Sequence, residues 1–233
     1  MIETLFTRLD SWRHLPNYQL ERRADLFFSL YLKEVLEEKL GFEVSEHIIP
    51  EFPIRIGCIF PNTPIDKSYK IDYVAFSKCG KKGILIKLKT EAMSRREKQD
   101  DYLNACCRTG MPKILTGVID IFKVTNAKRK YFTLLEYLEM TRQIAIPLKL
   151  RQIMQADNLI GSTAASNEIQ IISEVDELNV IYIQPRKEKN NEISFDEFAN
   201  VVKRHEDTVS QRFAKSLIDW ASVVAGDKRI DLN

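Results

Sequence analysis

The chain has 233 residues, of which 44% are hydrophobic, and its formal net charge is +2. That length can bury one good core, and the small net charge identifies no partner by itself. No run approaches the roughly 18 apolar residues of a membrane span, and the N-terminal segment mixes acids with bases, unlike a secretory signal. The four cysteines form no CxxC pair and the three histidines are scattered, which favours neither zinc nor disulfides. We therefore expect a cytoplasmic protein with no membrane partner.

The first half of the chain shows helical and then strand-like patterns. Apolar spacing predicts helices over 2–14 and 18–40, the second ending at Gly41. Strand-like segments follow at 43–49 and 52–60, and two more, 69–77 and 83–89, flank the turn KCGKKG and predict a β-hairpin. Ser94 and Glu97 have the spacing of a capping box, which opens a helix that ends near Gly110.

The second half is predicted to be mostly helical. The expected elements are helices over 112–124, 128–142 and 147–157, a loop over 162–166, two strands within 169–185, and helices over 194–204 and 206–225. A strand pattern that returns after helices usually joins the existing sheet, so this order predicts an α/β fold with a central mixed β-sheet flanked by helices. We expect a single domain over 1–233. Its core would span about 18–110 and 168–186, with a helical insertion at about 111–160 before the last strands and C-terminal helices at about 194–225.

The region from Lys78 to Lys98 carries an excess of positive charge. It contains eight basic residues against two acids, Glu91 and Glu97. The basic residues are Lys78, Lys81, Lys82, Lys87, Lys89, Arg95, Arg96 and Lys98. A patch of this kind attracts phosphate groups, although a run of charge is more often a solvated face.

Two of these lysines belong to the predicted hairpin. Residues two apart in a strand share a face, so Lys87 and Lys89 project together. On the preceding strand, Asp72 lies in the half-buried pattern KIDYVAF. Because a buried carboxylate needs a cation or several donors, we expect Asp72 to face the two lysines and to be neutralised by them.

This arrangement resembles the PD-(D/E)xK nuclease superfamily. The likeness consists of an acid in a hairpin, a strand ending in x-x-K-T, and a helix with Ser-Arg-Arg and Gln-x-x-Tyr. It covers about 20–107 and a late strand at 179–184, and it implies a restriction-endonuclease-like fold. In that family, Asp72 and the backbone carbonyl of Leu88 would hold a divalent metal, and Lys89 would assist the attacking water.

The resemblance also implies functional residues on two helices. Gln99 and Tyr102 match the polar pair that RecB-like members place near the site. The helix 18–40 would supply a further acid from one of its later glutamates: Glu34, Glu37 or Glu38. The pair on the later helix also has a structural interpretation, since side chains three residues apart can edge the core and bond one another.

This chain departs from the family at the second acid, where Lys87 stands. An ammonium has no lone pair for a metal. At ~5 Å and an effective dielectric constant of ~20, it would repel Mg²⁺ by roughly 6 to 7 kcal/mol. We therefore expect an ion pair of Lys87 with Asp72, no cofactor and no cleavage. If an acid has migrated into the site, Glu91 is the first candidate, followed by Asp100 or Asp101, and Mg²⁺ or Mn²⁺ would be bound.

Three functions remain open from the sequence. The first is a nuclease-like protein that binds nucleic-acid phosphates, DNA rather than RNA, through the basic residues of 78–98, Arg95 and Arg96 among them, and those at 128–130. The second is a non-catalytic interaction or scaffold protein whose partner is another protein or a second copy of the chain. The third is an active metal-dependent nuclease with a migrated acid.

Overall fold

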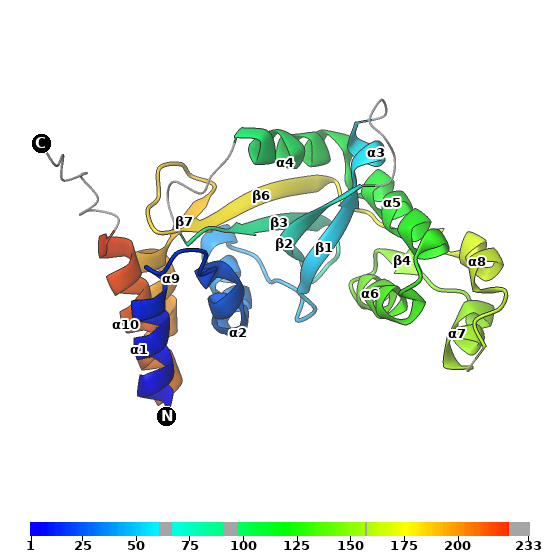
Figure 1. Cartoon of the computed structure of the whole chain (residues 1–233). Helices are drawn as coiled ribbons and strands as arrows, with labels where there is room; N and C mark the ends of the chain where they lie inside the picture. Colours follow the sequence, from blue (N-terminus) through cyan, green and yellow to red (C-terminus); the bar gives the residue numbers. More distant parts are fainter. Residues whose placement is uncertain (61–66, 91–96, 157, 224–233) are drawn as a thin grey trace, which may run out of the picture. The chain divides into compact units, whose positions relative to one another are not determined.

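The computed structural model describes residues 1–60, 67–90, 97–156 and 158–223 (Figure 1). The chain divides into two compact units, one made of 1–42, 87–96 and 181–233 and the other of 43–86 and 97–180. The predicted α/β class with a mixed sheet is confirmed: five strands follow the order β1-β2-β3-β6-β7, with β1, β2 and β3 antiparallel and β6 parallel to β7. That 1–233 forms one domain stays a prediction.

The elements of the first unit are α1 (Ile2–Trp12), α2 (Leu20–Leu40), β7 (Glu192–Ser194), α9 (Phe195–Val202) and α10 (Thr208–Val223). Strands β3 (Lys82–Leu88) and β6 (Glu177–Gln184) contribute residues to both units. The second unit contains β1 (Ile49–Arg55), α3 (Ile56–Ile59), β2 (Ser68–Phe76), α4 (Glu97–Thr109), α5 (Met111–Val124), α6 (Lys128–Met140), β4 (Ile144–Ala145), α7 (Leu148–Gln155), α8 (Ser162–Ala165), a 3-10 helix (Ser166–Glu168) and β5 (Gln170–Ile171).

Aromatic rings fill the core of the first unit. Phe28 of α2 contacts three rings of α9 and α10 at centroid distances of 5.1 to 5.6 Å: Phe195, Phe198 and Phe213. Helix α1 lies beside α10 (Figure 1). Asp10 fixes it there, because its carboxylate accepts hydrogen bonds from Arg212 at 2.6 Å and from the indole of Trp220 at 2.8 Å. Each such ring pair adds about 0.5 to 1.5 kcal/mol to the free energy gained from ordinary burial. These ring contacts therefore stabilise the packing of α2 against α9 and α10.

The second unit is built on the meander β1–β2–β3, against which α5 packs. Strand β1 is the edge of the sheet and carries Pro50 and Pro53, residues without an N–H that an edge strand tolerates. Gly117 lets α5 approach α3 closely, because a Cβ at position 117 would lie 2.7 Å from the Sγ of Cys58 in α3. The small side chain at 117 is therefore a packing requirement of this unit.

Most predicted helices and the hairpin are confirmed, with corrections at short elements. The strand predicted over 43–49 is wrong, since only Val44 makes an isolated bridge there, and 52–60 is the end of β1 followed by α3. The loop predicted over 162–166 is helical, and β4 and β7 were not predicted. Such short pieces depend on distant pairing partners, which leave little periodicity in the sequence. The predicted capping box begins at Ser94, which lies outside the described residues.

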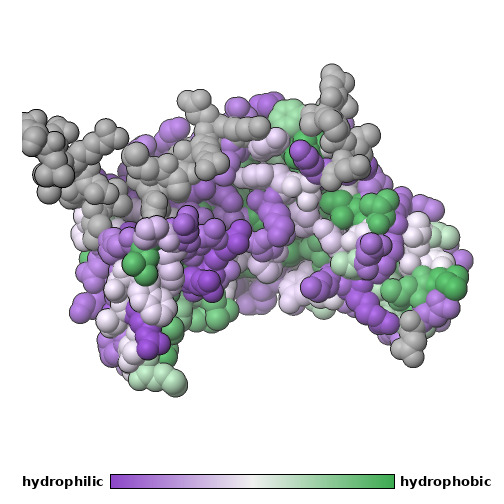
Figure 2. All heavy atoms as spheres, viewed as in Figure 1, coloured by the Kyte–Doolittle hydropathy of each residue, from purple (hydrophilic) through white to green (hydrophobic). Residues whose placement is uncertain are grey.

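Several apolar side chains remain on the surface of the second unit. Figure 2 shows hydrophobic residues over α7 and α8, where Leu148 is 69% exposed and Ile160 is 79% exposed. Among the residues described, no helix combines the length and apolar character that crossing a bilayer would require.

Candidate functional site

Asp72 lies on β2 of the second unit and is half-buried between Ile71 and Tyr73. The hairpin register pairs Val74 with Leu85 and Tyr73 with Ile86. Because alternate residues of a strand share a face, Asp72 belongs to the face of Val74 and Leu85. Asp72 belongs to the second unit and the lysines at 87 and 89 to the first, so their predicted pairing stays a prediction.

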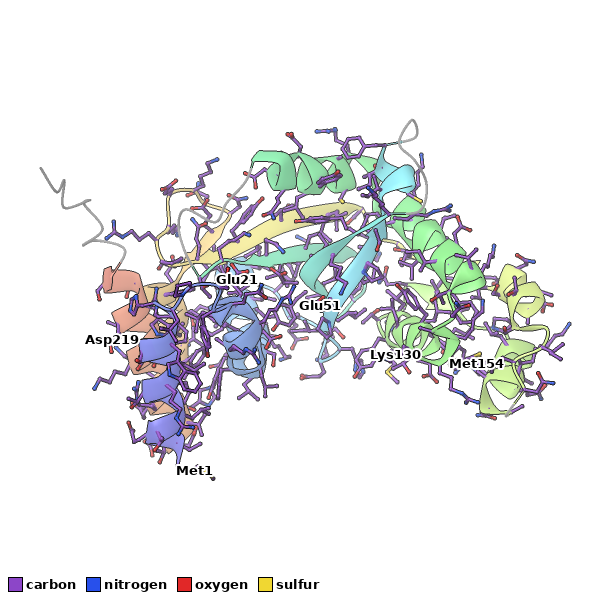
Figure 3. All side chains as sticks on the ribbon, viewed as in Figure 1. Met1, Glu21, Glu51, Lys130, Met154 and Asp219 are labelled. Atoms are coloured by element: carbon purple, nitrogen blue, oxygen red, sulfur yellow. The ribbon has the colours of Figure 1, made fainter. Side chains whose placement is uncertain are left out.

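A second carboxylate lies across from Asp72 on the other neighbouring strand. The register of β1 with β2 pairs Pro50 with Tyr73 and Phe52 with Ile71, which leaves Glu51 opposite Asp72. Like charges in opposed positions are destabilising. Glu51 has a positive φ of 51° and pairs with Lys70 at 2.9 Å (Figure 3). The Glu51 carboxylate is thus held in an exposed ion pair with Lys70.

Lys87 and Lys89 stand at the end of β3 in the first unit and are buried, with 8% and 5% of their surface exposed. The backbone N–H of Lys89 donates to the carbonyl of Ile183 at 2.8 Å, which bonds this strand end to β6. The intervening Leu88, the predicted carbonyl donor to a metal, is also buried. Since a buried ammonium is costly without compensation, both lysines are parts of the packed interior and are little available to an external phosphate.

The first helix does bring an acid to this strand end, although not one of the predicted ones. Glu21, in the first turn of α2, accepts a hydrogen bond from the backbone N–H of Thr90 at 3.3 Å (Figure 3). The carboxylate therefore lies next to the residue that follows Lys89. The signal in the sequence was an acid in the first turn of this helix, where the helix dipole favours negative charge.

The predicted glutamates of α2 have other partners. Glu34 bonds His205 at 2.7 Å, and Glu38 bonds Arg204 at 2.6 Å. Glu37 pairs with Lys33 one turn earlier at 3.0 Å. At 1.5 Å per residue, Glu34 begins about 20 Å along the helix from Glu21. These acids fasten α2 to the residues after α9 or stabilise α2 itself.

Gln99 and Tyr102 lie on α4 in the second unit. The ring of Tyr102 stacks on Tyr69 of β2, with centroids 5.2 Å apart and planes 14° apart, and Phe60 meets it edge-on at 5.4 Å. Burial raises the pKa of Tyr69, and the carboxylate of Asp72 raises it further, so this aromatic cluster lies near the acid. The Oε1 of Gln99 is buried without a hydrogen-bond partner in the part of the chain that the structure describes. The structure thus gives Tyr102 a packing role beside Asp72.

The lysines around the hairpin turn are paired with acids on the surface. Lys78 lies 3.0 Å from Glu43, and Lys82 lies 3.0 Å from Glu177. Lys81 lies 3.7 Å from its nearest acid, Glu174. Each pair is solvent-exposed and therefore contributes only about 0 to 1 kcal/mol. The positive excess seen in the sequence is largely balanced here by acids from distant segments.

The basic residues at the start of α6 also serve internal contacts. Lys128 donates to the carbonyls of Phe122 and Lys123 at the end of α5. Arg129 donates to the carbonyls of Met154 at 3.1 Å and Ala156 at 3.0 Å at the end of α7. These cations stabilise helix C-termini, whose dipole end is negative. Lys130 is exposed (Figure 3).

Three predicted residues lie outside the described residues: the migrated-acid candidate Glu91 and the phosphate-binding candidates Arg95 and Arg96. Within the described ranges, no group of three or more His, Cys, Asp or Glu side chains could hold a metal ion. No family model, curated protein or solved structure matches this chain.

Proposed function

We propose that this chain is a nuclease-like protein of the PD-(D/E)xK type that binds nucleic-acid phosphates and does not cleave them. The observation that carries the proposal is the burial of Lys87 at the strand position where the resemblance expects the second acid. At ~5 Å the Lys87 ammonium would oppose a divalent cation by roughly 6 to 7 kcal/mol, which removes much of the attraction that a single remaining carboxylate would supply.

The binding of phosphate is supported by cations whose present partners are weak. The surface pairs of the hairpin turn can exchange a carboxylate for a phosphate oxygen at little cost, because an exposed pair is worth about 0 to 1 kcal/mol. Phosphate contacts of this kind give an affinity that falls steeply with salt.

A direct test combines binding and cleavage on one labelled DNA duplex and the matching RNA. We expect binding that weakens steeply between about 50 and 200 mM salt, and an intact nucleic acid after incubation with Mg²⁺ or Mn²⁺. Absence of binding at the lowest salt would remove the proposal. Cleavage that EDTA stops and Asp72→Ala abolishes would instead establish the alternative of an active nuclease with a migrated acid.

A second candidate is a protein-interaction role for the same scaffold. The exposed Leu148 of α7 and Ile160, which precedes α8, favour it, since apolar surface of this kind is common at protein interfaces. Binding tests on nucleic acid separate the two, because an interaction protein of this type would bind neither DNA nor RNA.

A further inference from the structure

The loop between β6 and β7, residues 185–191, presents a basic surface on an ordered backbone. Its side chains Arg186, Lys187 and Lys189 are exposed. The buried carboxylate of Glu192 accepts the backbone N–H groups of Glu188 at 2.6 Å and Lys189 at 2.8 Å. The side-chain amide of Gln184 donates to the carbonyl of Arg186 at 2.8 Å. The loop is therefore held in shape by hydrogen bonds to its backbone, and the side chains of Arg186 and Lys189 are left to solvent.

The charge balance of this loop differs from that of the hairpin turn. Among the described residues, no acid forms an ion pair with Arg186 or Lys189. By contrast, each lysine of the hairpin turn, Lys78, Lys81 and Lys82, forms an ion pair with an acid. Lys187 pairs with Glu197 at 2.8 Å. Uncompensated cations raise the local potential and attract a polyanion more strongly than paired ones.

Lys39 of α2 adds a further cation next to the loop. It donates to the backbone carbonyl of Glu192 at 2.8 Å. Burial lowers the pKa of Lys39, and the neighbouring ammonium of Lys187 lowers it further, while the carboxylates of Glu197 and Glu192 act in the opposite direction. Two neighbouring ammonium groups repel each other. Glu197, paired with Lys187 at 2.8 Å, supplies one negative charge beside them, and a phosphate would supply a second.

A cavity of about 210 Å³ adjoins Lys39. Its lining residues are Val35, Glu38, Lys39, Ile193, Glu197 and Val201. The two carboxylates in that lining are already paired, Glu38 with Arg204 at 2.6 Å and Glu197 with Lys187 at 2.8 Å. At about 30 Å³ for each water molecule, the space holds several waters or one phosphate group.

We propose that the 185–191 loop and Lys39 form the phosphate-binding surface of this protein, with one phosphate seated at the pair of Lys39 and Lys187 and its neighbours contacted by Arg186 and Lys189. This inference rests on the proposed function and moves its phosphate contacts from the hairpin turn to the β6–β7 loop. The ligand is the sugar-phosphate backbone, which is contacted without sequence preference.

Two matched triple variants test the assignment. The loop variant carries Arg186→Ala, Lys187→Ala and Lys189→Ala, and the turn variant carries Lys78→Ala, Lys81→Ala and Lys82→Ala. Each removes three positive charges, and the loop variant keeps the backbone N–H groups that bond Glu192. Fluorescence anisotropy of a labelled DNA duplex gives affinity as a function of salt, and circular dichroism checks that both variants fold.

We expect the loop variant to lower the slope of log affinity against log salt by about 2 to 3, because each phosphate contact contributes about 0.9. The turn variant should change it by less than half as much. The inference is overturned if the turn variant lowers the slope of log affinity against log salt and the loop variant leaves that slope unchanged. An unmodified protein that binds no DNA at about 50 mM salt overturns the proposed function as well.

Discussion

The buried carboxylate of Glu192 offers a quantitative test of how the β6–β7 loop is held. The side chain is 0% exposed and accepts two backbone hydrogen bonds from the loop, at 2.6 and 2.8 Å. Two hydrogen bonds to a charged group are together worth about 3 to 6 kcal/mol. Because Glu188 and Lys189 are on an exposed loop, water can bond their N–H groups in the variant and replace part of this hydrogen-bond energy. We therefore expect Glu192→Ala to lower the free energy of unfolding by about 3 kcal/mol.

For a chain of this size, that change corresponds to a fall in melting temperature of about 6 to 12 °C in a thermal unfolding experiment. Glu192→Gln keeps an acceptor oxygen and loses only the charge, so its effect should be less than half as large. Glu188→Ala is the matched control, because Glu188 contributes its backbone N–H and not its side chain. A Glu192→Ala protein that melts within about 2 °C of the parent would refute this account of the loop.

Three further predictions concern the strand end, acid stability and packing. Lys87→Glu should create affinity for Mn²⁺ measurable by calorimetry, because it replaces a repelling ammonium by a carboxylate; no heat of binding would count against the PD-(D/E)xK assignment. Burial alone would raise the pKa of Glu197, but bonds from Lys187 and the N–H of Ser194 outweigh it and leave this pKa below its ordinary value. A carboxyl group with a depressed pKa stabilises the folded protein at pH values above its unfolded-state pKa, and this stabilisation is lost as the pH falls through its folded-state pKa. Glu197→Gln should therefore make the free energy of unfolding fall less steeply at acid pH. An unchanged pH dependence there would contradict this. Gly117→Ala should lower the melting temperature despite the better helix propensity of alanine, because the new Cβ would lie 2.7 Å from the Sγ of Cys58. Adding Cys58→Ala should recover part of the lost melting temperature. A Gly117→Ala protein that melts at a higher temperature than the parent would refute the packing argument.

The sequence by itself determined the elements whose signals are local. Alternation on both sides of a glycine-containing turn predicted the hairpin, which the register of Tyr73 with Ile86 confirms. Gly41 ends α2 with a φ of 72°, a conformation that glycine adopts without strain. The same local logic placed Lys87 and Lys89 together at a strand end, because side-chain direction in a strand repeats every two residues.

Only the tertiary structure decided which charges are paired and which acid lies at the strand end. Glu21 meets Thr90 across 69 positions of sequence, and Lys39 meets Glu192 across 153. The lysines of the hairpin turn look like an uncompensated patch until Glu174 and Glu177 are brought beside them. Composition and periodicity report on neighbours along the chain, whereas an ion pair depends on distance in space, and for that reason the candidate phosphate surface emerged only with the fold.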